Sequence, residues 1–327
     1  MMSTSTFASA ASDSGTTLES PARPTRGRLG TYLELVRFSH TIFALPFAVM
    51  AALIAIHADG VDGSGDPARS LVLPILGILA CMVTARTAAM AFNRLVDRVI
   101  DAQNPRTANR HLPRGDVSPR DVLLLVVFSS IGFIAATLLF LPNWLPLVFS
   151  LPVLAWLLGY SFAKRFTSLA HLWLGAALGL APVATWIALR GETLLQDPTD
   201  MFPAAILGLA VTTWVAGFDM IYACQDAGFD AAHGLHSVPA RVGVAAALSR
   251  AKWLHCATLL LLAWLPETVP SLGLPYWAAV GIIAALLAWE HALVRPDDLS
   301  RVNQAFFTAN AAIGLVLLAA IGIDLWV

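Results

Sequence analysis

Residues 70–92 read SLVLPILGILACMVTARTAAMAF, and residues 93–101 continue the chain as NRLVDRVID. The first stretch carries a single charge, at Arg86. A helix rises 1.5 Å per residue, so about 20 apolar residues cross the ~30 Å hydrocarbon layer of a bilayer. This stretch therefore predicts a transmembrane helix, and the polar residues that follow it lie at the membrane boundary.

Runs of the same kind recur to the end of the chain. We predict nine transmembrane helices, at residues 35–57, 70–92, 121–141, 144–160, 168–189, 203–223, 246–265, 274–293 and 304–326. Strands of a membrane barrel are shorter and alternate apolar with polar residues, which these runs do not do. The expected fold class is therefore all-α, as a polytopic membrane protein.

The composition of the whole chain agrees with this fold class. Of the 327 residues, 57% are hydrophobic and 13% are charged, and the mean hydropathy is +0.71. Soluble domains carry about 25% charged residues, so the composition excludes a soluble α/β enzyme. It gives no support to a nucleic-acid partner, and the 3 cysteines show no spacing typical of disulfides or zinc sites.

The placement of Lys and Arg sets the expected orientation, because short cytoplasmic loops hold most of these residues. With the N-terminus inside, the cytoplasmic segments contain all of the 20 Lys and Arg residues except Arg69, Arg86 and Arg190. We expect an integral protein of a bacterial inner membrane, with a cytoplasmic N-terminus and an external C-terminus. Residues 1–30, rich in Ser, Thr and Ala, are predicted to be a disordered tail before one transmembrane domain at 31–327.

A first set of candidate ligands follows the second predicted helix. Asn93, Asp97 and Asp101 are four residues apart, so their side chains share one face of a helix. Oxygen ligands at a membrane boundary suit Mg²⁺, which takes one or two carboxylates together with substrate phosphate oxygens. A simpler alternative is a solvated helix end, in which the two aspartates pair with Arg94, Arg98 or Arg106. This motif alone leaves both interpretations open.

A second acidic row follows the sixth predicted helix and repeats the spacing. Asp226 and Asp230 are four residues apart, and Asp219 precedes Asp226 by seven. Four or more carboxylates gathered at one boundary repel one another strongly unless cations neutralise them. We therefore predict that the two rows face each other and hold two or more Mg²⁺ ions with a diphosphate. The cytoplasmic ends of the second and sixth helices are the expected place of function.

With these motifs, the sequence resembles the UbiA superfamily of intramembrane prenyltransferases over nearly the whole chain after the tail. The resemblance rests on Asn93, Asp97 and Asp101 with the following PRTANRHLPRG, on residues 160–167 (YSFAKRFT) and on residues 219–243. The last of these segments, with DMIYACQD and HGLHSVPARVG, is most similar to the 4-hydroxybenzoate polyprenyltransferase-like branch.

The chain departs from the family pattern at three positions. Arg94 follows Asn93 where the family often has an aspartate, so one common acidic residue is missing. His111 stands where many members have proline, and His236 where many have lysine. These departures bear on the substrate more than on the family.

The resemblance implies nine helices around a central cavity, with a lateral opening to lipid and a cytoplasmic cap formed by the two motif loops. It implies transfer of a polyprenyl group from a polyprenyl diphosphate to an aromatic acceptor, with Mg²⁺ as cofactor. The implied metal ligands are Asn93, Asp97, Asp101, Asp226 and Asp230, and the four aspartates are the predicted catalytic residues.

A further set of residues is expected to contact the substrates. An arginine within a membrane helix is costly unless it is paired or faces a cavity, so Arg86 is predicted to bind diphosphate or to pair with a nearby carboxylate. Arg37 is expected to bind the diphosphate or the acceptor carboxylate, or to anchor its helix on the cytoplasmic side. By resemblance, Lys164 binds the diphosphate and Tyr160 lines the site. The expected substrate-binding residues are Arg37, Arg86, Asn93, Arg110, Tyr160, Lys164 and Asp219.

The sequence thus predicts Mg-dependent prenylation of 4-hydroxybenzoate or a related hydroxy-aromatic acid, in the biosynthesis of ubiquinone or menaquinone. Another acceptor, such as a dihydroxynaphthoate or haem, stays open because residues from several helices would choose it. A cation-coupled transporter is a further alternative. Transporters hold their ionisable residues near the bilayer midplane, whereas these acids lie at helix ends, which favours the enzyme.

Overall fold

The computed structural model is a bundle of long helices that describes residues 28–35, 45–58, 67–304 and 309–326. Within these ranges the elements are all helical, with no β-strand, which confirms the expected all-α class. Of the predicted tail, only residues 28–30 are described, and they begin the short helix α1 (Arg28–Leu35). The boundary placed between residues 30 and 31 stays a prediction.

The long helices of the described ranges follow the predicted apolar runs in order. They are α2 (Leu45–Ala58), α3 (Pro67–Gln103), α4 (Pro119–Thr137), α5 (Leu145–Ala163), α6 (Ala170–Gln196), α7 (Phe202–Ala223), α10 (Val244–Trp264), α11 (Leu274–Leu293) and α13 (Asn310–Trp326). Short helices connect them: η2 (Leu138–Phe140), η3 (Pro198–Met201), η4 (Cys224–Asp226), α8 (Ala227–Ala232), α9 (Val238–Val242), η5 (Leu265–Glu267) and α12 (Val302–Gln304).

Six helical segments of the described chain are long and apolar enough to cross a membrane. They contain α3, α4, α5, α6, α7 and α11. Helices α2 and α13 are apolar but shorter, with 14 and 17 residues, and the predicted first and last spans extend into residues 36–44 and 305–308, outside the described ranges. Helix α10 has 21 residues but carries Arg250 and Lys252 in its first half. The protein is therefore an integral membrane protein, and the count of nine spans stays a prediction.

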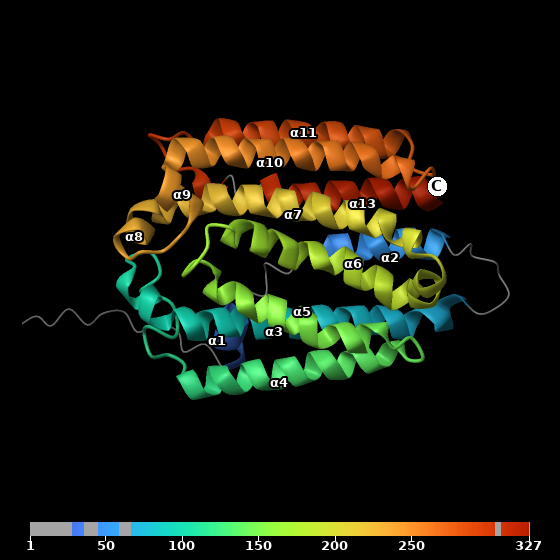
Figure 1. Ribbon diagram of the computed structural model, residues 1–327, viewed down its shortest axis with the longest axis horizontal. Helices are drawn as coiled ribbons and strands as arrows, with labels where there is room; N and C mark the ends of the chain where they lie inside the picture. Colours follow the sequence, from blue (N-terminus) through green and yellow to red (C-terminus); the bar gives the residue numbers. More distant parts are fainter. Residues whose placement is uncertain (1–27, 36–44, 59–66, 305–308, 327) are drawn as a thin grey trace, which may run out of the picture.

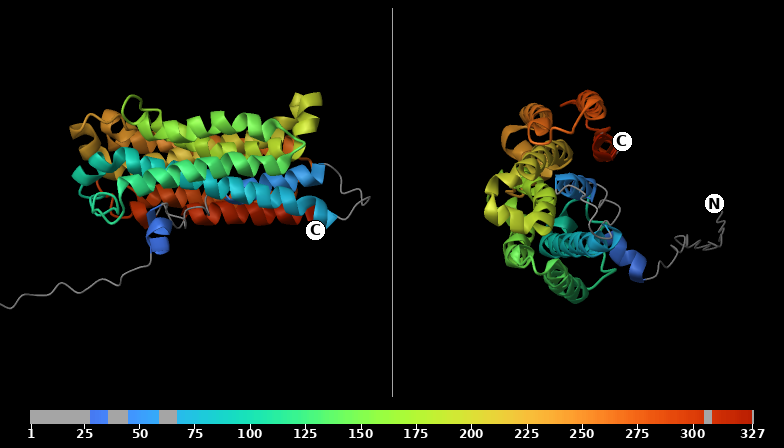
Figure 2. Two further views of the ribbon diagram at one scale, coloured as in Figure 1. Left: turned by 90° about the horizontal axis from the view of Figure 1, so that it is seen from below. Right: turned by 90° about the vertical axis from the view of Figure 1, so that its right-hand side faces the viewer.

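The helices run side by side, with short elements gathered at one end. Helices α3, α4 and α5 lie on one side of the bundle and α10, α11 and α13 on the other, with α2, α6 and α7 between them (Figures 1 and 2). The turns at residues 104–118 and helices α8 and α9 lie together at one end, which we call the cap end, and the C-terminus lies at the opposite end (Figure 1).

Glycines bring α6 and α7 into close contact. A Cβ added at Gly179 would overlap the carbonyl oxygen of Gly208, and one added at Gly175 would overlap that of Thr212. Small residues at a helix crossing let the backbones approach, which is how membrane helices pack when lipid supplies no hydrophobic drive between them. This crossing fixes α6 against α7, and each of them carries residues of the cavity described below.

The tightest packing lies on the α7 side of the bundle. The largest cluster of buried apolar residues joins α2, α6, α7, α10, α11 and α13, and includes the fully buried Trp214 and Tyr276. By contrast, α5 has many exposed apolar side chains, such as Val148 and Leu151, as expected of a surface that faces lipid. The space enclosed by α3, α5 and α6 is not filled in this way, and it holds the candidate site.

Candidate active site

A cavity of about 620 Å³ runs between α3, α5, α6 and α7. At the cap end its walls carry charged and polar side chains from α3, α5, α7 and the segment 104–118. Away from the cap end the walls are mostly apolar, although Thr137, Ser150 and Thr185 also line them. We call this second part the apolar arm; its lining includes Ile78, Met82, Phe140, Val153, Ala184 and Ala188.

The apolar arm follows α3 for most of the thickness of a bilayer. From Asn93 at the charged end to Ile78 the helix rises ~22 Å. At the far end, the ring of Phe140 packs directly over Gly77, where even a Cβ would meet it. The cavity therefore joins a charged end to a long apolar arm.

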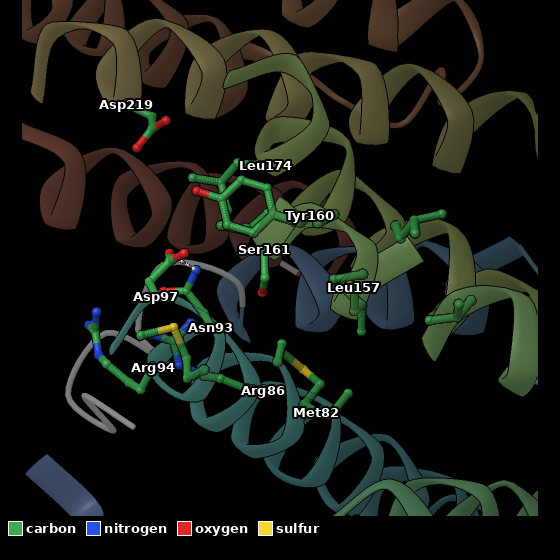
Figure 3. Close-up of a pocket in the computed structure, with 18 of the residues that line it drawn as sticks. Met82, Arg86, Asn93, Arg94, Asp97, Leu157, Tyr160, Ser161, Leu174 and Asp219 are labelled. Atoms are coloured by element: carbon green, nitrogen blue, oxygen red, sulfur yellow. Dashed lines mark hydrogen bonds between the residues drawn. The ribbon is translucent and has the colours of Figure 1, made fainter. Parts of the chain in front are cut away.

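The first acidic row lies along α3 and lines this cavity, and Figure 3 shows Asn93 and Asp97 there. The side-chain amide of Asn93 donates to Oδ2 of Asp97 at 3.1 Å. Nη2 of Arg165 donates to Oδ1 of Asp97 at 3.1 Å, and Nη1 of Arg110 lies 2.7 Å from each carboxylate oxygen of Asp101. The long helix α3 thus continues past the apolar run and places these oxygens on one face, as the spacing predicts.

The second acidic row lies opposite, at the end of α7. Asp226, in η4, accepts hydrogen bonds from Nε of Arg106 at 2.7 Å and from the side-chain amide of Asn104 at 3.1 Å, and it also pairs with Nη2 of Arg106. Nη1 of Arg106 donates to the hydroxyl of Tyr222 at 3.0 Å. Burial opposes the charge of Arg106, but the hydrogen bond and the charge of Asp226 outweigh it and raise the pKa of this arginine.

The two rows line the same end of one cavity, and Asp97, Asp101 and Asp226 each pair with a different arginine. The pairs formed by Asp97 and Asp101 are not those named by the simpler alternative, because Arg165 and Arg110 come from later in the chain and Arg106 pairs with Asp226 instead. Asp101 and Asp226 are only 6% and 7% exposed, so these two carboxylates are largely withdrawn from solvent.

Asp230 gives a direct test of whether the site fits a cation. It is 3% exposed and lines the cavity, and its Oδ2 has no hydrogen-bond partner among the described residues. A buried carboxylate oxygen without a partner is costly unless a proton or a cation satisfies it. No group of three His, Cys, Asp or Glu side chains among the described residues is poised to hold a metal ion. The donors are nevertheless hard oxygens, the type that Mg²⁺ takes.

The predicted substrate-binding residues lie around the same cavity, with one exception. Arg86 and Asn93 line it from α3, while Tyr160 and Lys164 line it from α5 and its end. Figure 3 shows Tyr160 and Asp219 across the cavity from the α3 side chains. Arg110 lies in the segment 104–118 and also lines the cavity. The exception is Arg37, which lies outside the described residues.

Three residues near this end were missed by the sequence reasoning. Asn104 and Tyr222 both contact the Arg106–Asp226 pair. His171, at the start of α6, hydrogen-bonds Asp219. A signal existed for Asn104, which stands three residues after Asp101, and for Tyr222, which lies one turn before Asp226 on α7. His171 lies within an apolar run, where nothing in the sequence indicates a partner 48 residues away.

The sequence has clear relatives. Residues 41–312 match the profile of the UbiA prenyltransferase family. A 4-hydroxybenzoate octaprenyltransferase of Methylobacillus flagellatus is 31% identical over 255 residues, which cover 76% of this chain and 81% of the relative. A 4-hydroxybenzoate octaprenyltransferase of Nitrosococcus oceani is 30% identical over 300 residues, which cover 90% of this chain and 97% of the relative.

Solved structures share the fold. The apo structure of a UbiA homolog from Aeropyrum pernix K1 superposes with a TM-score of 0.74 at 33% identity, covering 88% of this chain and 98% of that one. A UbiA homolog from Archaeoglobus fulgidus bound to DMAPP and Mg²⁺ superposes with a TM-score of 0.63 over 91% of this chain and 98% of that one. The identity with the second is 19%, so this likeness concerns the fold alone.

Proposed function

Because this chain belongs to the UbiA prenyltransferase family, we propose that it transfers a polyprenyl group from a polyprenyl diphosphate to 4-hydroxybenzoate or a related hydroxy-aromatic acid. The reaction forms a bond between the allylic carbon of the donor and a ring carbon of the acceptor. It releases diphosphate and a ring proton. The product is a precursor of a quinone such as ubiquinone or menaquinone.

The observation that carries this proposal is the joining of a charged end and an apolar arm in one cavity. A polyprenyl diphosphate has the same division, with an anionic head and a long apolar tail. Four basic residues that line the charged end are proposed to hold the diphosphate: Arg86, Arg106, Arg110 and Lys164. The apolar arm receives the tail, and because its walls resemble lipid, the tail enters from the bilayer at little cost.

The oxygens of the two acidic rows are proposed to hold Mg²⁺. The ligands are Asn93, Asp97 and Asp101 on α3, and Asp226 and Asp230 at the end of α7. Bound there, Mg²⁺ would neutralise the charge that develops on the leaving diphosphate. The protein's own part is to exclude water along the apolar arm and to add fixed positive charge from its arginines and Lys164, which favours cleavage of the bond to the leaving group.

The acceptor is proposed to lie between Tyr160 and Asp219. These side chains line the cavity across from Asn93 and Asp97. The carboxylate of Asp219 is suited to accept a hydrogen bond from the acceptor hydroxyl, which makes the ring richer in electrons. We also propose that the cap end faces the cytoplasm, because the segments there carry most of the Lys and Arg residues.

A direct assay tests the function. The purified protein in nanodiscs is supplied with Mg²⁺, radiolabelled polyprenyl diphosphate and a panel of aromatic acids, and labelled product is measured. We expect prenylation of a hydroxybenzoate by the wild type, lost in Asp97→Ala and Asp226→Ala and after addition of EDTA.

A matched control is Asp121→Ala. Asp121 is an exposed aspartate at the start of α4 that does not line the cavity, so this variant is expected to keep its activity. Folded wild-type protein that prenylates no acid and releases no diphosphate would overturn the proposal.

A further inference from the structure

His171 makes two hydrogen bonds that join three separate elements. It is the second residue of α6 and is 1% exposed. Its Nδ1 lies 2.7 Å from Oδ2 of Asp219 on α7. The backbone N–H of Val238, the first residue of α9, donates to its Nε2 at 3.4 Å. One side chain thus connects the wall of the cavity with the cap end.

These two contacts determine the state of the ring. Because Nε2 accepts a hydrogen bond from a backbone N–H, it carries no proton. The proton of the neutral imidazole is then on Nδ1, which donates to the carboxylate of Asp219. Both ring nitrogens are satisfied at a buried position, so the ring is fixed in tautomer and orientation.

The bond to His171 also orients Asp219. The Asp219 side chain is 18% exposed, and it lines the cavity opposite the α3 residues (Figure 3). Because Oδ2 is held by His171, Oδ1 is the carboxylate oxygen that can accept a hydrogen bond from a ligand in the cavity. Without this hydrogen bond, the Asp219 side chain could adopt more than one of its staggered rotamers.

We propose that His171 is a positioning residue that holds Asp219 in the orientation required to accept the hydroxyl of the aromatic acceptor. This inference rests on the proposed function, since it presumes that an acceptor binds beside Asp219. Loss of a hydrogen bond to a charged group is worth roughly 10- to 100-fold in activity. The bond to Val238 further makes the orientation of Asp219 depend on the placement of α9.

Acceptor and donor kinetics separate this role from general support of the fold. We expect His171→Leu to lower kcat/KM for the acceptor by roughly 10- to 100-fold while KM for the prenyl diphosphate stays within about twofold. His171→Gln should restore most of the loss, because a carboxamide can donate to Asp219 and accept from Val238. Equal losses for both substrates, or a folded His171→Leu with normal acceptor kinetics, would overturn the proposal.

Two further variants keep the test sharp if His171→Leu is unstable. If His171 acts through Asp219, adding His171→Ala, which removes the hydrogen bond, to Asp219→Ala should cause no further loss in kcat/KM. His255→Leu is the matched control. His255 is a histidine of similar burial, 2% exposed, on α10 away from the cavity. His255→Leu is expected to reduce thermal stability without changing kcat/KM for the acceptor relative to that for the donor.

A spectroscopic measurement gives a result that does not depend on the acceptor. In protein labelled with ¹⁵N-histidine, we expect a neutral His171 ring protonated at Nδ1, identified by the loss of its signals in His171→Gln. Asp219→Ala should shift the Nδ1 signal. If the His171 ring is protonated at Nε2, the inference is wrong even if the acid is prenylated. If the ring is protonated at Nδ1 but the protein prenylates no acid, only the proposed function is refuted.

Discussion

The length of the prenyl chain that the protein accepts can be changed at Ala184. This residue lies on α6, lines the apolar arm and is exposed toward the cavity rather than packed. It is ~20 Å along the helix from His171 at the cap end, and the arm continues past it to Ala188 and Phe140. Ala184→Phe therefore narrows the arm well beyond the charged end and leaves the charged end itself unchanged.

The expected magnitude follows from the physics of the tail. Moving a prenyl tail from lipid into an apolar cavity gains little, because both surroundings are apolar. Steric fit therefore decides the preference, and a side chain forced against a packed neighbour costs about 1–3 kcal/mol. That cost corresponds to roughly a 5- to 150-fold loss in kcat/KM for a long donor. The shortest donor, dimethylallyl diphosphate, does not reach Ala184, so its rate should stay within about twofold.

Competition between the two donors in one assay measures the preference directly. Ala135→Phe is the matched control, because Ala135 is an exposed alanine of α4 that does not line the cavity. We expect the control to behave as the wild type with both donors. Equal losses for the short and the long donor in Ala184→Phe, or no loss with the long one, would refute the placement of the tail in this arm.

Three other substitutions test the packing and the charged end. In Gly179→Leu the new side chain would overlap the backbone of Gly208. We therefore expect the free energy of unfolding to fall by at least about 1–3 kcal/mol, measured as a lower thermal midpoint. An unchanged midpoint would contradict the close crossing of α6 and α7. Asp200→Ala removes the carboxylate that pairs with the buried Arg190 and should lower the free energy of unfolding by about 3 kcal/mol. Asp200→Asn should have an intermediate stability. Equal thermal midpoints for the two variants would contradict a stabilising role of the charge on Asp200. Arg106→Gln should raise KM for the prenyl diphosphate at least about tenfold with little change in KM for the acceptor. A larger rise in KM for the acceptor than for the prenyl diphosphate would place the diphosphate elsewhere.

The helices could be predicted where the apolar run and the helix end together. The run at 274–293 coincides with α11 (Leu274–Leu293), and the run at 203–223 differs from α7 by one residue. The run at 70–92 marks only the apolar part of α3, which continues to Gln103. Hydropathy indicates where a helix leaves the apolar layer, not where its backbone hydrogen bonds end. It therefore does not show how far a helix continues through polar residues.

The site could be predicted only as far as local spacing allows. A four-residue spacing places Asn93, Asp97 and Asp101 on one face of α3, because that follows from helical geometry alone. The partner of Asp226 is 120 residues away at Arg106, and no local pattern specifies such a pair. The basic residues of the segment 104–118 look alike in sequence, and only the fold decides which aspartate each one meets.

The pairing of acids with arginines explains how the site can hold so many charges before any substrate binds. Asp97, Asp101 and Asp226 each pair with a different arginine, which offsets the repulsion expected between carboxylates at one boundary. Such pairs are only partly shielded: the Arg106 side chain is 30% exposed, so exchanging its partner costs little compared with a fully buried pair. We expect Arg106 and Arg110 to leave their aspartates for the diphosphate when those oxygens take up cations, so that both sets of charges stay neutralised throughout the exchange.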